Sequence, residues 1–346
     1  MRIRNRIPWP IIAISLLILC VLYISTASFG WQIFRPVIGD ATALTPATQP
    51  PTSQVATDTS TPTNTPTPIY TPMPTYTPSS ASVVFVGAGD IADCSRVQDE
   101  QTAQLLDNIQ GTVFTVGDNA YPNGTAFNYS NCYEPTWGRH KARTHPAVGD
   151  NEYDSSSGAA DYFNYFGPAA GDPTKGYYSY DLGNWHIIVL NSNCSRIGGC
   201  RSNSAQGHWL QADLAANPST CTLAIHHKPL FSSNGGASSM RNFWNLLYGV
   251  GADIVLSGDR HNYERFALQN PSGVADPGRG IRQFVVGTGG AGLSSFGPTA
   301  PNSEVRNNST YGVLKLTLHP TSYDWQFIPI AGQTFSDSGS ALCVTP

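Results

Sequence analysis

Short apolar runs recur along the chain from residue 82 onward, and most of them end in a turn that contains glycine. Apolar runs of four to eight residues bounded by glycine predict buried strands. Four of these runs lead into Gly-Asp, and they lie at 82–88, 112–116, 146–148 and 253–256. A fifth run, 222–225, ends in His226-His227-Lys228-Pro229.

Helical patterns separate these strands. In the first, 95–110, leucine and isoleucine side chains fall on one face. Two further helices are predicted at 205–215 and 238–248, and strands at 177–180, 185–190, 284–286, 313–318 and 325–328. Strands alternate with helices in the first part of this region and dominate its C-terminal part. The pattern therefore predicts one compact domain of α/β character over residues 82–346.

Composition limits the partners of this domain. The chain has 346 residues and a formal net charge of -4, and no basic stripe with interleaved aromatic residues is present. This balance argues against a nucleic-acid surface. We therefore expect no nucleic-acid partner, and the sequence makes no prediction of the oligomeric state.

The N-terminal part of the chain predicts export. A basic start at 1–6 precedes an almost uninterrupted apolar run at 7–24, so residues 1–27 are a signal peptide or a signal anchor. Both alternatives fit the length of the run. Residues 28–81, richest in Thr and Pro from Thr45 to Ser80, predict a disordered stalk. The chain is then secreted or membrane-anchored and extracytoplasmic, with membrane contact only through an uncleaved N-terminal segment.

The cysteines agree with export. An even set of six follows Cys20, at positions 94, 132, 194, 200, 221 and 343. In an exported chain such a set predicts disulfide bonds. Cys194 and Cys200 can close a small loop, and the spacing leaves the other pairings open.

Metal-ligand side chains occur at the ends of the predicted strands. A carboxylate after each Gly, a tyrosine three residues after Asp118 and histidines near two of the tips are oxygen and nitrogen donors that can surround two metal ions. The predicted ligands are Asp90, Asp118, Tyr121, Asp150, His227, Asp259 and His261. Asp118 is the expected bridge, because a carboxylate has two oxygens and can hold two cations.

The order of these motifs resembles that of the calcineurin-like metallophosphoesterases, and within them the purple acid phosphatase branch and its secreted bacterial relatives. Two features are specific to that branch, namely Tyr121 at its distance from Asp118 and the run His261-Asn262-Tyr263-Glu264-Arg265. The other matching motifs are Gly89-Asp90, Gly149-Asp150-Asn151-Glu152, His227-x-Pro229 and Gly287-Thr288-Gly289-Gly290. The resemblance covers roughly residues 83 to 340.

This resemblance implies a four-layer sandwich, an α/β (α+β) fold of two mixed β-sheets flanked by helices, with a dinuclear metal site at the C-terminal tips of the strands. It implies two metal ions, Fe(III) with Fe, Zn or Mn, because tyrosinate favours Fe(III). The implied ligands of the first ion are Asp90, Asp118, Tyr121 and His261. Those of the second are Asp118, Asp150, His227 and Asp259. His227 is the match, since the family's ligand lies two residues before the proline.

Two positions depart from the family's pattern. Asp150 stands where the family has asparagine, with Asn151 in place of its substrate-side histidine, and Asp259 stands where the family has histidine. Asn151 can neither give nor take a proton. The general acid then remains open among Glu152, His145 and His226.

The added carboxylates also change the charge of the ligand set. We expect about five negative charges, hence weaker binding of phosphate monoesters and reliance on Lys228, Arg260 or Arg265 for oxyanion charge. The alternative role of Arg260 is to pair with Asp259. The predicted catalytic residues are Asp118, Asn151, Arg260 and His226.

The resemblance and the residues together predict an exported phosphoesterase that hydrolyses a small phosphorylated substrate through a metal-activated hydroxide. The rival interpretation is an inactive member of the family that binds a ligand at the cell surface. The departures at Asp150, Asn151 and Asp259 motivate the rival, and the retained ligands Asp90, Asp118, Tyr121, His227 and His261 favour the enzyme.

Overall fold

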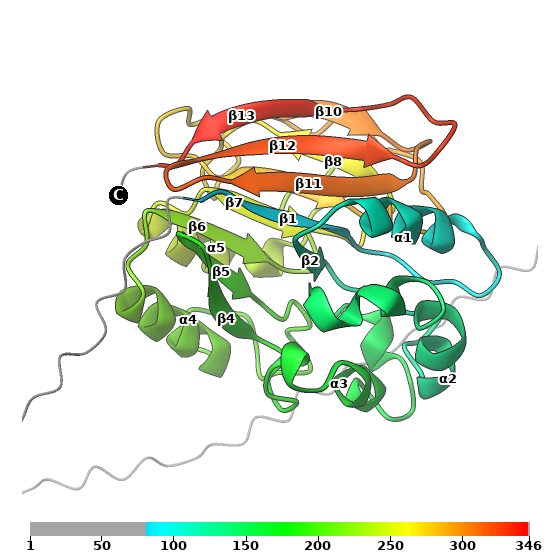
Figure 1. Ribbon diagram of the computed structural model, residues 1–346. Coiled ribbons are helices and arrows are strands. Elements are labelled where there is room, and N and C mark those ends of the chain that lie inside the picture. Colours follow the sequence, from blue (N-terminus) through cyan, green and yellow to red (C-terminus); the bar gives the residue numbers. More distant parts are fainter. Residues whose placement is uncertain (1–80, 345–346) are drawn as a thin grey trace, which may run out of the picture. The chain divides into compact units, whose positions relative to one another are not determined.

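The computed structural model describes residues 81–344, which contain two β-sheets with helices beside them (Figure 1). Sheet 1 has six strands in the spatial order β13 (Ser338–Leu342), β12 (Ser322–Pro329), β11 (Gly312–Leu318), β1 (Val83–Ala88), β2 (Thr112–Thr115) and β3 (Thr144–His145). Sheet 2 has seven strands in the order β10 (Ser303–Asn307), β8 (Tyr263–Phe266), β9 (Arg282–Val286), β7 (Ile254–Ser257), β6 (Cys221–Ile225), β5 (Trp185–Val189) and β4 (Tyr178–Leu182).

Both sheets are mixed. In sheet 1 the strands β1, β2 and β3 run parallel, and in sheet 2 the strands β5, β6, β7 and β9 do so. The remaining neighbours pair antiparallel. Because parallel strands end at the same edge of a sheet, the turns after β1 and β2 lie together in sheet 1, and those after β6 and β7 lie together in sheet 2. The N–H of Gly89 after β1 donates to the carbonyl of Val286 in β9 over 3.0 Å, which joins the two edges.

The main core lies between the two sheets and extends to the helices beside sheet 1. Along β6 the side chains of Leu223 and Ile225 belong to this core, whereas Ala224 belongs to a second core on the other face of sheet 2. The alternation follows from the two-residue period of a strand. Since both faces of β5, β6 and β7 are buried, these strands are apolar at nearly every position.

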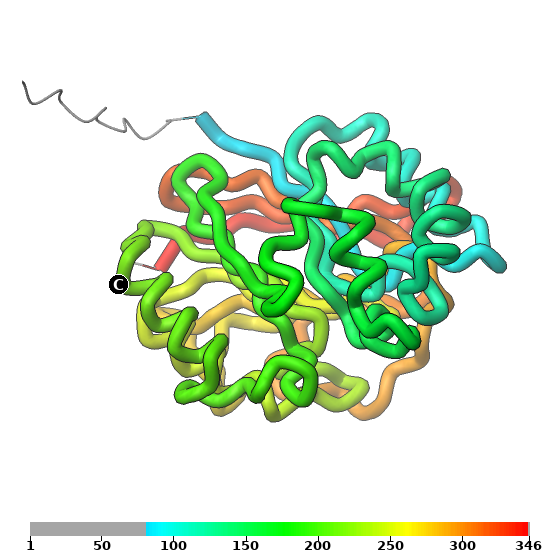
Figure 2. Tube along the Cα trace, turned by 90° about the horizontal axis from the view of Figure 1, so that it is seen from below, coloured from blue at the N-terminus to red at the C-terminus, as the bar shows by residue number. Residues whose placement is uncertain are grey.

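Helices cover the outer faces. Leu210 of α4 (Ala205–Ala216) and Phe243 and Trp244 of α5 (Arg241–Gly249) form the second core with sheet 2. Leu106 of α1 (Gln98–Asn108) belongs to the main core beside sheet 1. Figures 1 and 2 place α2 (Ala126–Asn128) and α3 (Ala160–Phe166) at one end of the domain and α4 at the other. The predicted fold of two mixed sheets flanked by helices is thus confirmed.

Short 3-10 and π-helical segments complete the connections. They are the π-helical turn Tyr129–Tyr133 and the 3-10 turns Trp137–Arg143, Asn151–Tyr153, Gly167–Ala170 and Ser238–Met240. The last of these precedes α5, so the predicted helix at 238–248 is a 3-10 turn followed by an α-helix. The predicted helix at 95–110 is shorter, because Asp93 accepts hydrogen bonds from the backbone and hydroxyl of Ser95 and holds the preceding residues in a turn.

One predicted strand is wrong. Residues 146–148 form no strand, and the strand beside β2 is the two-residue β3 that precedes them. Pro146 has no N–H group to continue the ladder. The N–H of Ala147 still donates to the carbonyl of Thr115 over 3.2 Å, so the segment stays alongside β2 and carries Gly149-Asp150 to the same edge.

All six cysteines after Cys20 form disulfide bonds. The pairs are Cys94–Cys132, Cys194–Cys200 and Cys221–Cys343. The predicted disulfides, including the small loop closed by Cys194 and Cys200, are confirmed. The last pair ties the C-terminal segment to the start of β6.

The predicted segment 1–27 and the predicted stalk up to residue 80 lie outside the described residues. Within residues 81–344, every helix is too short or too polar to cross a bilayer.

A buried histidine links β4, β5 and α4 through charge. Nδ1 of His186 lies 2.9 Å from Oδ1 of Asp181, and Nε2 lies 2.9 Å from Oδ2 of Asp213. Both ring nitrogens can donate only in the protonated form. Burial lowers the pKa of His186, but the two carboxylates outweigh burial and raise the pKa above its usual value.

We expect this histidine to make the stability of the domain depend on pH. Because its folded-state pKa is raised, its contribution is fully present below about 6.5, the ordinary pKa of histidine, and is lost as the pH rises through the folded value. Asp181 is largely exposed, so the expected loss is about 1 kcal/mol. Urea unfolding between pH 6 and 9 measures it, and His186→Gln should flatten that slope. An unchanged slope in the variant would assign the pH dependence elsewhere.

Candidate metal centre

Three of the predicted aspartates share an unusual backbone conformation. Asp90, Asp118 and Asp259 have φ angles of 56°, 51° and 65°. Asp tolerates this left-handed region better than most residues, yet such strain is found mainly at functional sites. Each of the three follows a glycine at the end of a parallel strand or directly after it, so the turns after β1, β2 and β7 present their carboxylates in the same way. Asp150 differs, with φ -84°.

Two glycines permit the close approach of these turns. A Cβ on Gly149 would lie 2.0 Å from Oδ1 of Asp118, and one on Gly117 would lie 2.6 Å from the ring of His227. Gly117 also has φ +96°, a region that other residues rarely adopt. Glycine is therefore needed at positions 117 and 149, where a histidine ring and a carboxylate pack against backbone.

The four ligands predicted for the first ion converge on one point. The hydroxyl of Tyr121 lies 2.9 Å from Oδ1 of Asp90, 2.9 Å from Oδ2 of Asp118 and 3.1 Å from Nε2 of His261. Nε2 of His261 lies 3.2 Å from Oδ1 of Asp90. A single phenol proton cannot serve all three neighbours, so the arrangement is that of donors around a shared cation.

A second group forms around His227. Its Nε2 lies 3.0 Å from Oδ1 of Asp150, 3.3 Å from Oδ1 of Asp118 and 3.9 Å from Oδ1 of Asp259. Ligand atoms of Asp150, His227 and Asp259 all lie within 4.8 Å of one another, as do those of Asp90, Asp118 and His227. Asp118 thus faces Tyr121 with one oxygen and His227 with the other, as expected of a bridging carboxylate.

Both histidine rings are oriented by backbone carbonyls. Nδ1 of His227 donates to Val116 O over 2.8 Å, and Nδ1 of His261 donates to Gly292 O over 2.7 Å. The Nε2 atoms then face the carboxylates, where each can hold a proton or a metal ion. Nε2 of His227 is fully buried and has no hydrogen-bond partner among the described residues, despite its near carboxylates. A metal ion would satisfy this buried nitrogen, so the residues present fit a metal centre.

Negative charge dominates the cluster. Burial lowers the pKa of the two histidines, but facing carboxylates outweigh it, and they raise the pKa of His261 to about 9 and that of His227 well above its usual value. Burial, together with Asp90 and Asp118, raises the pKa of the Tyr121 phenol. The common cause is a surplus of carboxylate charge, which favours cations in general, whether protons or metal ions.

A buried glutamate holds the two central turns together. Its Oε1 accepts hydrogen bonds from Asn119 N over 2.7 Å and from the Tyr129 hydroxyl over 3.2 Å, and its Oε2 accepts from Gly149 N over 2.6 Å and Asp118 N over 3.2 Å. This residue is Glu152, which is 0% exposed. It joins the turn that carries the bridging aspartate to the turn that carries Asp150.

The pKa of this glutamate reflects opposing effects. Burial and the charge of Asp118 raise the pKa of Glu152 to about 7, while the N–H groups of Asn119 and Gly149 act in the opposite direction. The ionised form is the one that accepts from all of these donors. The sequence left Glu152 as one of three candidates for the general acid. The structure surrounds its buried carboxylate with five donors, four of them from the two turns, and only this burial reveals its role.

The remaining predicted residues lie at different distances from the cluster. Asn151 is half-buried, and its backbone N–H donates to Oδ1 of Asp118 over 3.0 Å. Nε of Arg260 lies 3.1 Å from Oδ2 of Asp259. His226 is fully buried on the side away from the cluster. There its Nδ1 donates to Lys228 O and its Nε2 accepts from Trp244. Burial lowers the pKa of His226 to about 4, so this ring is neutral.

Two further candidates have other partners. Arg265 lies on β8, away from the strand tips, and pairs with Asp337 and Glu304. His145 stacks on Tyr180 with ring centroids 3.9 Å apart. Neither Arg265 nor His145 belongs to the group of side chains that converge on Tyr121 and His227.

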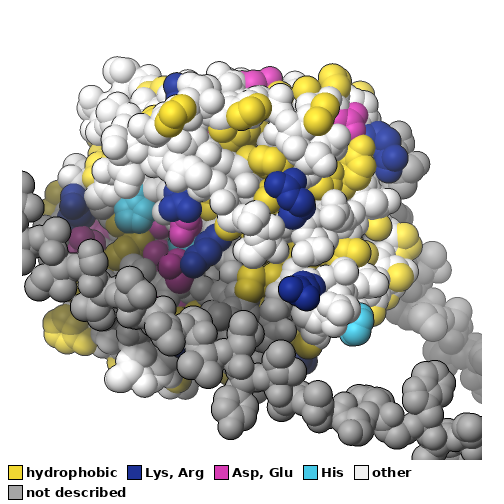
Figure 3. All heavy atoms as spheres, turned by 180° about the vertical axis from the view of Figure 1, so that it is seen from behind, with side chains coloured by type: hydrophobic (Ala, Val, Ile, Leu, Met, Phe, Trp, Pro, Cys, Tyr) yellow, Lys and Arg dark blue, Asp and Glu magenta, His cyan; other side chains and the backbone are white. Residues whose placement is uncertain are grey.

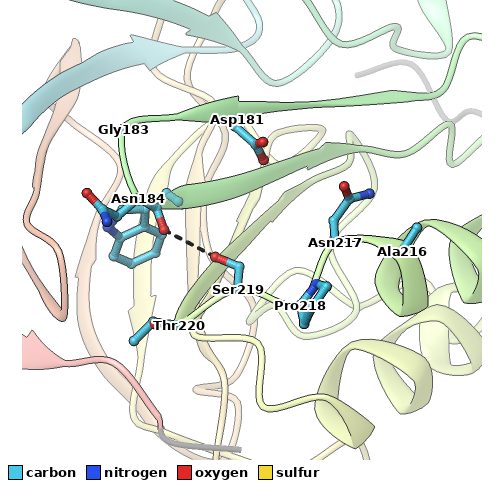
Figure 4. A pocket seen from close by; sticks show the side chains of 9 residues that line it. Asp181, Gly183, Asn184, Ala216, Asn217, Pro218, Ser219 and Thr220 are labelled. Atoms are coloured by element: carbon cyan, nitrogen blue, oxygen red, sulfur yellow. Dashed lines mark hydrogen bonds between the residues drawn. The ribbon is translucent and has the colours of Figure 1, made fainter. Parts of the chain in front are cut away.

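One face of the domain carries side chains of both charges. Figure 3 shows one face of the domain on which acidic, basic and histidine side chains gather in one region. A separate hollow of about 330 Å³ lies where the β4–β5 turn meets the loop between α4 and β6 (Figure 4). Ser219 donates there to Asn184 O over 3.1 Å. Asp181 is the one charged residue in its lining, so this hollow offers no metal-ligand set.

Curated relatives of the chain are phosphatases by name. The chain is 34% identical to purple acid phosphatase 21 of Arabidopsis thaliana over 161 residues, which is 42% of this chain and 35% of the relative. It is 26% identical to the probable inactive purple acid phosphatase 1 of the same plant over 277 residues, 67% of this chain and 43% of the relative. The alignments thus cover about a third to under a half of these relatives. No family model matches the sequence.

Solved structures share the fold. A purple acid phosphatase from yellow lupin (Lupinus luteus) seeds matches with a TM-score of 0.59 and 22% identity, over 76% of this chain and 54% of that chain. GAP50, the anchor in the inner membrane complex of Plasmodium, matches with a TM-score of 0.56 and 13% identity, over 77% of this chain and 90% of that chain. At these identities the likeness concerns the fold alone.

Proposed function

We propose that this chain, which belongs to the calcineurin-like metallophosphoesterases in their purple acid phosphatase-like branch, is a phosphoesterase that works with two metal ions. The observation that carries the proposal is the convergence of four carboxylates, two histidines and a tyrosine at the tips of parallel strands. Within residues 81–344 the buried Nε2 of His227 has no hydrogen-bond partner.

The two ions would be held by overlapping sets of residues. Asp90, Tyr121 and His261 would hold the first, and Asp150, His227 and Asp259 the second, with Asp118 between them. We propose Fe(III) beside Tyr121, because a phenolate is a hard donor, and Fe, Zn or Mn at the second position. When bound, such a pair stabilises charge on phosphoryl oxygens and makes hydroxide available near neutral pH.

The chain's own residues then prepare the site. The carbonyls of Val116 and Gly292 fix the orientation of the histidine rings. Glu152 fixes the two turns that present Asp118 and Asp150. We propose that Asn151, at the edge of the cluster, contacts the substrate as a neutral group. We propose that His226 supports the site indirectly, since its buried ring bonds Trp244 and the Lys228 carbonyl.

Removal of metal tests this proposal. Prolonged dialysis against a chelator should abolish hydrolysis of an aryl phosphate monoester and of the corresponding diester, because the acidic cluster alone repels the anionic substrate. Resupply of Mn, Zn or Fe should restore turnover. Hydrolysis that survives complete metal removal, verified by elemental analysis, would contradict the proposal.

The second candidate function is binding without turnover. The ion pairs that Asp150 and Asp259 make with Lys228 and Arg260 favour it, since they occupy two carboxylates that the second ion needs. A chain that binds orthophosphate but hydrolyses neither ester under any metal supply would support this candidate.

We also propose an extracytoplasmic location. Three disulfide bonds support it, since such bonds persist in oxidising compartments. The proposed N-terminal signal peptide or anchor would deliver the domain there, and the expected partner is a small phosphorylated molecule.

A further inference from the structure

The two carboxylates that depart from the family's pattern each have two neighbours. Asp150 places Oδ1 3.0 Å from Nε2 of His227 and Oδ2 3.2 Å from Nζ of Lys228. Asp259 places Oδ1 3.9 Å from the same ring nitrogen and Oδ2 3.1 Å from Nε of Arg260. Each carboxylate therefore faces the metal cluster with one oxygen and a cation with the other.

The two cations lie on the open side of the cluster. The side chains of Lys228 and Arg260 are 31% and 33% exposed, whereas that of His227 is 0% exposed. Lys228 directly follows His227 after β6, and Arg260 directly follows Asp259 after β7. Both cations thus come from the strand tips that supply the second group of ligands.

Their donor groups are only partly used. Nε of Arg260 donates to Gly235 O over 3.0 Å, which fixes the guanidinium, and its terminal nitrogens have no hydrogen-bond partner within residues 81–344. The ammonium of Lys228 has three N–H donors, and Asp150 is its partner in the described part of the chain. Both groups therefore keep donors for an incoming anion.

Charge explains why the pairs occur together. Two added carboxylates would repel an anionic substrate, but each pair of Asp150 with Lys228 and of Asp259 with Arg260 sums to zero. We infer that Lys228 and Arg260 bind the phosphoryl oxygens of the substrate, and that they neutralise the two added carboxylates beside the second metal position. This inference rests on the proposed function.

The pairing gives the cations a distinctive signature. A residue that only supports the structure would weaken metal binding and phosphate binding together when it is lost. Loss of the Lys228 charge should instead weaken phosphate binding and strengthen metal binding. One positive charge beside the metal positions is removed, while the carboxylate of Asp150 stays.

Calorimetric titration of the full chain tests this signature with two probes, Mn²⁺ alone and orthophosphate added to the Mn²⁺-loaded chain. Lys228→Met and Arg260→Met keep much of the apolar stems, and each should lower phosphate affinity at least about tenfold, as expected for a charge-assisted hydrogen bond. Mn²⁺ affinity should stay equal or rise. Lys175→Met is the matched control, because the Lys175 ammonium pairs with Asp172 over 3.0 Å and with none of the predicted ligands within residues 81–344.

The outcomes separate this inference from the proposed function. Phosphate affinity unchanged in both variants, or a parallel fall in Mn²⁺ and phosphate affinity, overturns the role of the cations while the enzyme proposal stands. A wild-type chain that binds no metal under any supply overturns the enzyme proposal and this inference with it. A fall in phosphate affinity with an equal or higher Mn²⁺ affinity, absent in the Lys175→Met control, supports the inference.

Discussion

Replacing Asp118 with asparagine is expected to abolish turnover and to lower metal affinity by more than about 100-fold. One oxygen of Asp118 lies 2.9 Å from the Tyr121 hydroxyl and the other 3.3 Å from Nε2 of His227, so one side chain serves both groups of ligands. Loss of a residue that merely orients a ligand costs about 10–100-fold. Loss of a shared ligand should exceed that range, because both positions lose a charge.

The fold should survive this change. An amide oxygen can still accept the hydrogen bond from Asn151 N, and removal of one of the clustered carboxylates relieves repulsion. We expect a melting temperature equal to or above that of the metal-depleted wild type. Asp172→Asn, in an exposed ion pair, is the control. Retained turnover in Asp118→Asn with an intact fold would show that Asp118 is not a metal ligand.

Replacing Glu152 with glutamine is expected to lower metal affinity about 10–100-fold although Glu152 is not itself a predicted ligand. One glutamine oxygen can replace Oε1 of the carboxylate, but the amide nitrogen would then face the N–H groups of Gly149 and Asp118. Each buried donor left unpaired costs about 1–3 kcal/mol. The turns that carry Asp118 and Asp150 should then separate.

Metal titration below the melting temperature distinguishes positioning from unfolding. Glu152→Gln should show both a reduced melting temperature and weaker metal binding while circular dichroism stays native. Glu134→Gln is the matched control, since Glu134 accepts a bond from Tyr165 at the exposed surface. Wild-type metal affinity in a folded Glu152→Gln chain would refute the positioning role.

The sequence predicts the buried strands and the residues at their tips well, because both depend on local patterns. Apolar runs such as 82–88 and 222–225 become strands, and Gly-Asp places a carboxylate just after a strand because the glycine admits close packing. The structure brings the predicted ligands together at the edge where the parallel strands end.

Two edge strands escape prediction for a physical reason, although the edge strand β4 is predicted and the interior strand β8 is not. β10 (Ser303–Asn307) and β13 (Ser338–Leu342) are edge strands, only partly buried, so neither needs an apolar run. Ser-Gly-Ser-Ala-Leu has little strand propensity of its own. Such strands form because a neighbour offers its free backbone groups, which the local sequence does not record.

The partners of polar side chains are likewise a tertiary property. Glu152 and His226 are both buried next to the predicted ligands in sequence, yet one braces two turns and the other faces Trp244. The pairing of Asp150 with Lys228 and of Asp259 with Arg260 joins residues whose relation depends on how the tips are placed. A negative charge counted along the sequence is therefore offset by cations that only the fold brings near.

The metal content of the purified full-length chain, measured together with hydrolysis of an aryl phosphate, tests the central claim most directly. We predict two metal ions per chain after supply of Fe, Zn or Mn, with turnover that rises as the second ion binds. At most one ion per chain and no turnover under any metal supply would contradict the claim, and would mean that Asp150 and Asp259 do not complete a second metal position.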